Sequence, residues 1–119
     1  MGVCDGAVFG RAVSATEDEA KRCAETVKIL FLEGKAKWLK EQCSGKVLYE
    51  FLEKRTNDLG YRLVKDVDGH RVSEFPHQKH TKVALPTVEF YPTAYLWILE
   101  LQIVHPTLPI GAFYEDLMF

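Results

Sequence analysis

The stretch Gly60–Phe75, with the sequence GYRLVKDVDGHRVSEF, separates a helical half of the chain from a half that reads as strands. Tyr61–Asp66 carries β-branched and aromatic residues and predicts a strand, and His70–Phe75 predicts a second strand that returns beside it. Asp68-Gly69 lies between them and is a strong hairpin signal, because a tight mirror-type turn needs positive φ, which glycine adopts without strain. The sequence therefore predicts a β-hairpin here.

Two helical patterns precede this hairpin. Thr16 is placed to cap the first helix, and Glu19 is placed to close a capping box with it. The apolar residues that follow recur at helical spacing: Ala20, Cys23, Ala24, Val27, Leu30 and Phe31. A second apolar stripe ends at Gly60, which suits the left-handed position just after a helix. The short break at Ser44-Gly45 predicts that the two helices are antiparallel neighbours.

Two further strands are predicted after the hairpin, over Val83–Tyr91 and Thr93–Val104. The second is the most hydrophobic segment of the chain, and its pattern is typical of a central strand. Pro86 cannot donate to a strand ladder, so it predicts an edge, a bulge or a break. Ile110–Phe119 is an apolar tail that we expect to dock on the rest of the domain.

This order of elements predicts a single domain of the α+β class. We expect residues 1–14 to be flexible or a short first strand, 15–59 a helical pair, 60–104 an antiparallel meander and 105–119 the apolar tail. The helices are expected to be antiparallel and packed on a four- to five-stranded antiparallel sheet. A chain of 119 residues is long enough to bury one core without cross-links.

Composition excludes several classes of function. The net charge is −2 with both signs interspersed, so the sequence shows no basic footprint for nucleic acid. Its apolar runs are too short to predict a membrane span. The cysteines Cys4, Cys23 and Cys43 are odd in number and follow no framework spacing, which favours a reducing, cytoplasmic compartment. Cys23 lies on the apolar face of its helix and is expected to be a small core hydrophobe.

Candidate chemical groups are sparse. His77 and His80 have a spacing that zinc sites use, with His105 as a third ligand, but their loop lacks a helical frame, so we expect no metal and no other cofactor. Glu89 and Glu100 are candidates for paired carboxylates on neighbouring strands, although two solvent-facing sheet residues explain them better. No catalytic motif is present in the sequence, and we expect a protein that is not an enzyme.

The order of elements and several short matches resemble the dynein light chain family, small homodimeric hub proteins built from a strand, two helices and a swapped-strand sheet. The matching residues are Ala7-Val8, Thr16, Cys23-Ala24-Glu25-Thr26, Glu50-Phe51, Leu63-Val64, Gly69, Val72-Ser73 and His80-Thr81-Lys82. Tyr61, Asp68 and Arg71 depart from the family's pattern. The resemblance covers roughly Ala7 to Gln102 and implies a dynein-light-chain-like fold.

The same resemblance implies a non-enzymatic cytoplasmic adaptor, associated with the cytoskeleton, that forms a homodimer and binds protein or peptide partners. An extended peptide would join the edge of its sheet by β-augmentation. The implied partner-binding residues are Gly69, His70, Arg71, Val72, Ser73, Glu74 and Phe75, with Lys46 at the start of the second helix.

Two alternatives stay open at this point. The first is a small α+β ligand-binding or enzymatic domain, with a pocket between the Val27–Phe31 part of the first helix and the sheet face carrying Tyr95 and Trp97. The second is an interaction domain whose apolar tail, Ile110–Phe119, is itself the partner-binding element.

Overall fold

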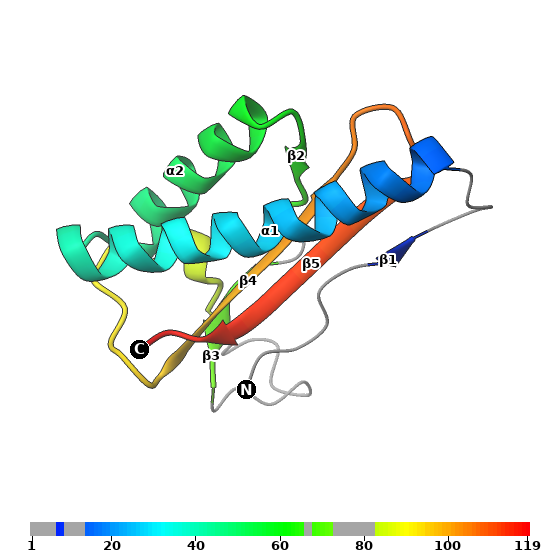
Figure 1. Ribbon diagram of the computed structural model, residues 1–119. Helices are drawn as coiled ribbons and strands as arrows, with labels where there is room; N and C mark the ends of the chain where they lie inside the picture. The colour runs from blue at the N-terminus through cyan, green and yellow to red at the C-terminus, as the bar shows by residue number, and fades with distance from the viewer. Residues whose placement is uncertain (1–6, 9–13, 66–67, 73–82) are drawn as a thin grey trace.

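The computed structural model describes residues 7–8, 14–65, 68–72 and 83–119, which form an antiparallel sheet with two helices on one face (Figure 1). The predicted α+β class is confirmed. The elements follow in this order: β1 (Ala7–Val8), α1 (Ser14–Glu41), α2 (Gly45–Asp58), β2 (Arg62–Leu63), β3 (His70–Arg71), the 3₁₀ helix η2 (Leu85–Thr87), β4 (Trp97–Val104) and β5 (Ile110–Leu117).

The long helix α1 differs from its predicted form at its start. It begins at Ser14, so Thr16 lies inside the helix and the predicted capping box is wrong. Glu19 instead accepts a hydrogen bond from the Tyr61 hydroxyl at 2.5 Å, which ties the first part of α1 to the segment after α2. The helix continues through Gly34, where a Cβ would lie 3.1 Å from Leu52 Cδ2, so the missing side chain lets α2 approach closely.

The second helix has the ends that its sequence predicts. Ser44 is the N-cap of α2, and its side chain accepts a hydrogen bond from Val47 N at 3.1 Å. Leu59 is the C-cap, and Gly60 follows with φ at 91°, the left-handed conformation expected there. Neither helix, nor any other helix among the residues described, is long and apolar enough to cross a bilayer.

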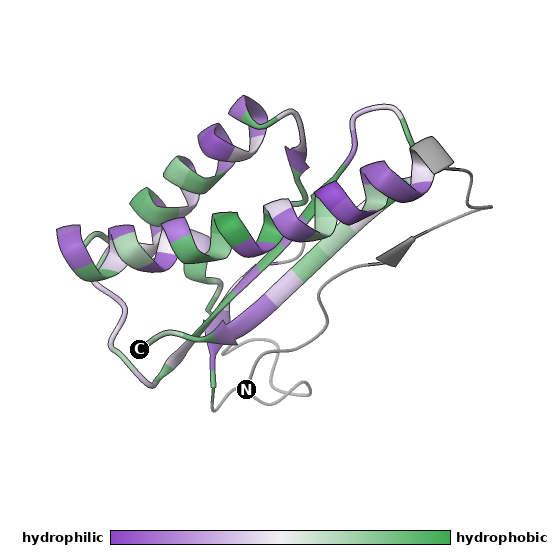
Figure 2. Ribbon diagram, in the orientation of Figure 1, coloured by the Kyte–Doolittle hydropathy of each residue, from purple (hydrophilic) through white to green (hydrophobic). Residues whose placement is uncertain are grey.

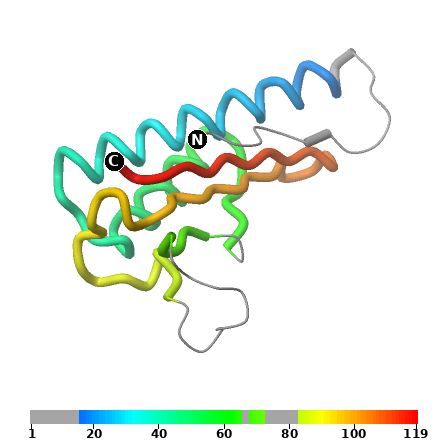
Figure 3. The backbone as a smooth tube through the Cα atoms, turned by 90° about the horizontal axis from the view of Figure 1, so that it is seen from below, coloured from blue at the N-terminus to red at the C-terminus, as the bar shows by residue number. Residues whose placement is uncertain are grey.

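β4 is the central strand of the sheet, as predicted. The strand order is β1-β5-β4-β2, with β3 also paired to β4, and every pairing is antiparallel. The segment predicted to dock as an apolar tail forms β5, which pairs with β4 along its whole length and runs beside α1 (Figure 3). β5 changes from hydrophobic residues near its start to hydrophilic ones near its end (Figure 2).

The core lies between the helices and one face of β4. Four β4 side chains on this face are fully or almost fully buried: Trp97, Leu99, Leu101 and Ile103. The residues between them lie on the other face and are half-buried. Each such side chain contributes about 1.5–3 kcal/mol by leaving water. From α1, Cys23 packs into this core with 0 % exposure, so its predicted role as a small core hydrophobe is confirmed.

One strand prediction in this half of the chain is wrong, and another begins too early. Val83–Tyr91 contains η2 in place of a strand, with Pro86 in the first turn of that helix, where its missing N–H costs nothing. The predicted strand from Thr93 begins only at Trp97, because Tyr95 has a left-handed φ of 67° and its N–H turns to bond Met118 O at 2.8 Å.

Candidate functional site

The predicted hairpin is wrong, because β2 and β3 do not pair with each other. Both pair with β4: β2 aligns Leu63 with Ile103, and β3 aligns His70 with Ile98. They are therefore two parts of one edge strand. Six residues separate Leu63 from His70 along the chain, whereas four separate their partners Ile103 and Ile98 in β4, so the two registers differ by two residues, as at a bulge.

Gly69 is required at this bulge because there is no room for a side chain, and not because the backbone makes a tight turn. It is buried, and its φ is not positive. A Cβ on Gly69 would lie 2.3 Å from Ile98 O and 2.5 Å from Leu85 Cδ2, distances that no real Cβ tolerates. Leu85 N also donates to Gly69 O at 2.8 Å, which holds the segment before η2 against the edge. The Asp-Gly pair thus marks a close backbone approach, which a local pattern cannot distinguish from a tight turn.

The hydroxyl of Tyr49 fills the gap that the bulge leaves in the strand ladder. Val64 N donates to Gln102 O at 2.8 Å, the last regular bond of this part of the ladder. Beyond it, Tyr49 Oη accepts from Gly69 N at 2.8 Å and donates to Glu100 O at 2.7 Å. The side chain is buried, and burial raises its pKa far above the ordinary value for tyrosine. A neutral hydroxyl from α2 therefore replaces a missing backbone bond.

The described part of the predicted partner-binding site lies on this edge. Gly69, His70, Arg71 and Val72 follow one another along it, and Val72 N bonds Leu96 O at 2.8 Å. The other predicted residues of this site, Ser73, Glu74 and Phe75, lie outside the described residues, and so do His77 and His80. Lys46 stands in the first turn of α2, on the wall of the pocket described next.

A pocket of ≈ 260 Å³ lies between α2 and the edge strand. Its apolar lining includes Leu63, Val64 and Pro86. Its charged lining consists of two basic and three acidic residues: Lys46, Lys65, Glu50, Glu53 and Asp68. Lys65 Nζ and Glu53 Oε2 form an ion pair at 2.9 Å across it. Sequence patterns do not reveal this pocket, because it depends on the shift in register that brings Val64, Lys65 and Asp68 beside α2.

The space proposed for a pocket under α1 is filled. Val27, Leu30 and Phe31 are at most 4 % exposed, and Trp97 is 2 % exposed opposite them. Tyr95 is 71 % exposed and lies on the surface, where its ring stacks on Phe119. The α1 residues and Trp97 therefore belong to the core, whereas Tyr95 belongs to the surface. The pocket described above lies beside α2.

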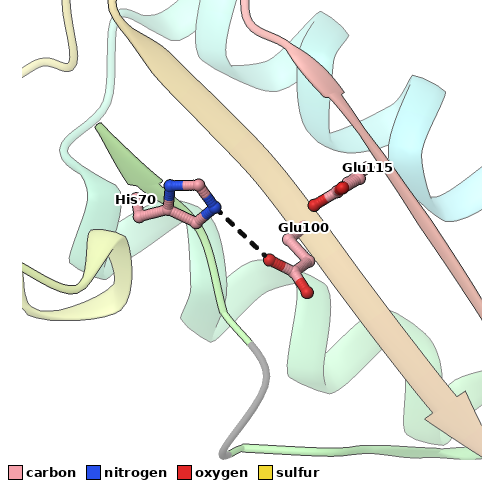
Figure 4. Close-up of side chains that lie close together, drawn as sticks. All are labelled: His70, Glu100 and Glu115. Atoms are coloured by element: carbon pink, nitrogen blue, oxygen red, sulfur yellow. Dashed lines mark ion pairs between the residues drawn. The ribbon is translucent and has the colours of Figure 1, made fainter. Parts of the chain in front are cut away.

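On the sheet face opposite the helices, three potential metal ligands meet across three strands (Figure 4). His70 comes from β3, Glu100 from β4 and Glu115 from β5, and Glu100 and Glu115 are direct cross-strand partners. One ligand atom from each lies within 4.8 Å of the others. Burial first, and then the charge of Glu115, raise the pKa of Glu100.

The remaining candidates lie apart from this cluster. Glu89 lies outside the described strands, so the carboxylate beside Glu100 is Glu115 and not Glu89. His105 stands after β4, where its Nδ1 accepts hydrogen bonds from Thr107 N and Leu108 N. Burial raises the pKa of Cys23 to about 11, which makes its thiol a poor nucleophile at neutral pH.

No protein-family model, curated protein or solved structure matches this chain. The resemblance to the dynein light chains therefore stays a prediction.

Proposed function

We propose that this protein is a non-enzymatic interaction module that binds an extended segment of a partner protein along the β2–β3 edge. The observation that carries the proposal is an edge strand with a side-chain pocket directly beside it. Successive residues of an edge strand direct their backbone groups alternately inward and outward. Val64 N points inward to Gln102 O, so the backbone groups of Leu63 point away from β4, where an added strand would meet them.

The pocket defines the chemistry of the partner segment. Leu63, Val64 and Pro86 provide an apolar lining that suits one aliphatic or aromatic side chain of the segment. Lys46 lies at the exposed start of α2 and would attract an acidic group flanking that side chain. The proposed partner is therefore an extended segment with an apolar anchor next to Asp or Glu.

Adaptor activity, homodimerisation and a cytoplasmic location complete the proposal. Homodimerisation is inferred from the resemblance alone, and a second copy that paired through the β2–β3 edge would compete with the partner segment. A reducing cytoplasm suits Cys23 and Cys43, which are free thiols whose pKa values burial raises.

Strand addition is tested with a peptide selected on the protein from a random display library. The peptide is then resynthesised with a single N-methyl group at each position in turn. We expect N-methylation to lower the affinity of the peptide by at least about tenfold at alternate positions, because a strand donates only every second N–H to the neighbouring strand. Losses without this period of two would contradict strand addition.

A matched pair of lysines on α2 tests where the peptide binds. Lys46→Ala should weaken binding, whereas Lys54→Ala, on the same helix and also exposed but outside this pocket, should not. Equal effects of the two substitutions would place the peptide elsewhere. Light scattering with and without the peptide then tests the dimer: competition for the edge predicts that peptide binding lowers the mass of any dimer.

A further inference from the structure

The hydrogen bonding of His70 identifies the ring nitrogen that faces away from the backbone. Nδ1 lies 3.1 Å from Arg71 O. A carbonyl oxygen only accepts, so Nδ1 is the donor in this contact, and Nε2 is the nitrogen that the ring would offer to a metal ion. Histidines that bind metals are oriented in this way, with the second nitrogen donating to a backbone carbonyl or carboxylate.

Nε2 of His70 faces a carboxylate. It lies 3.7 Å from Glu100 Oε1, which makes an ion pair when the ring is protonated, and Figure 4 shows the two groups pointing toward each other. This distance exceeds that of a good N–H···O hydrogen bond, which is about 2.7–3.2 Å. Two ligands of a tetrahedral zinc ion lie roughly 3.4 Å apart, as follows from bonds of about 2.0–2.2 Å. The distance of 3.7 Å between His70 Nε2 and Glu100 Oε1 is thus close to the distance between two ligand atoms on one zinc ion.

The two glutamates also create a local excess of negative charge. Glu100 and Glu115 face each other directly across β4 and β5, a cross-strand arrangement of like charges that destabilises a sheet. All three side chains are half-buried, which strengthens this repulsion relative to water. A cation between the three groups would neutralise the carboxylates and accept the lone pair of His70.

We propose that His70, Glu100 and Glu115 bind one divalent transition ion of the zinc type, with water in the fourth position. One imidazole nitrogen and two carboxylate oxygens suit zinc better than calcium or magnesium, which prefer ligand sets made of oxygen alone. The three ligand atoms lie within 4.8 Å of one another, so modest side-chain rotations bring them onto one ion. The bound ion would join β3, β4 and β5 and hold the bulged edge to the sheet. The proposed site shares β3 with the edge that the proposed strand addition uses.

Calorimetric titration of the metal-free full chain with zinc chloride tests the stoichiometry and the ligands. We expect one equivalent to bind, and His70→Ala and Glu115→Gln each to weaken binding by at least about tenfold. The isosteric Glu115→Gln variant keeps the test valid if His70→Ala does not fold. Magnesium or calcium binding as tightly as zinc would overturn the proposal, since it would show a nonspecific acidic site.

The other histidines and the cysteines supply the controls. The double variant His77→Ala/His80→Ala should retain the full equivalent of zinc. If it loses zinc while His70→Ala retains it, the proposed ligands are wrong. X-ray absorption of the zinc complex should show a first shell of nitrogen and oxygen at about 2.0–2.2 Å. Sulfur at about 2.3 Å would place the ion on cysteine and overturn the proposal.

Discussion

Substitution of Gly69 tests whether this position needs glycine because Ile98 and Leu85 lie so close to its backbone. A Cβ at this position would lie 2.3 Å from Ile98 O, and ordinary contact begins at 3.4 Å, so the edge must move by about 1 Å. Such a shift stretches the hydrogen bonds from Leu85 N to Gly69 O and from Gly69 N to the Tyr49 hydroxyl, both now 2.8 Å. Each bond contributes about 1 kcal/mol, and overpacking costs a further 1–3 kcal/mol, roughly. We therefore expect Gly69→Ala to lower the free energy of unfolding by about 3–5 kcal/mol if both bonds are lost.

Urea denaturation of four variants gives this prediction its control. Gly60 has φ at 91°, and a Cβ there would meet only Arg22 Nη2, at 3.9 Å. Asparagine tolerates a left-handed backbone better than alanine, so Gly60→Asn should cost less than Gly60→Ala. At Gly69 the two substitutions should both be severe, because steric overlap penalises any side chain. If Gly69→Asn were clearly milder than Gly69→Ala, the glycine would be serving a turn and the bulged edge would be refuted.

Three other substitutions test separate features of the fold. Tyr49→Phe should lower the free energy of unfolding by roughly 2–4 kcal/mol in urea, because it leaves Gly69 N and a β4 carbonyl unpaired; a loss below about 1 kcal/mol would contradict the bridging role. Gln42 has a left-handed φ of 52° at the end of α1, so Gln42→Gly should raise the thermal midpoint and stabilise by roughly 0.5–1 kcal/mol, whereas an unchanged midpoint would argue against strain there. The hydrogen bond from Tyr61 lowers the pKa of Glu19, so the bond stabilises the fold above the ordinary value of 4.5 and is lost as pH falls. The stability difference between wild type and Tyr61→Phe should therefore shrink below pH 4.5, and a difference that stays constant down to pH 3, roughly, would show that the pair is not linked to pH.

Features decided by neighbouring residues could be predicted from the sequence. Ser44 and Gly60 delimit α2 because capping depends on a few adjacent backbone groups. The central position of β4 follows from its hydrophobicity on both faces at its start. The helix pair likewise follows from apolar spacing and a short connection.

Features decided by distant partners could not be predicted in this way. Asp68-Gly69 has the local chemistry of a hairpin turn, but β4 offers both halves of the edge a better partner than they offer each other. The place of Glu115 cannot be predicted in this way, because the apolar segment Ile110–Phe119 predicts a docking tail and not a strand. Two prolines, Pro106 and Pro109, sit in the connection between it and β4, and they were the available signal that a strand turns back there.

The order of the elements has a consequence for biosynthesis, because β4 and β5 follow both helices. Every other described strand pairs with β4 or β5, so none of the described strand pairs can form before β4 has been made. Until then α1 and α2 have emerged with apolar faces, including Leu30 and Leu48, that have no sheet to cover them. Exposed hydrophobic surface of this kind makes a partly made chain prone to aggregation. A product that stops before Trp97 lacks every strand pairing described here.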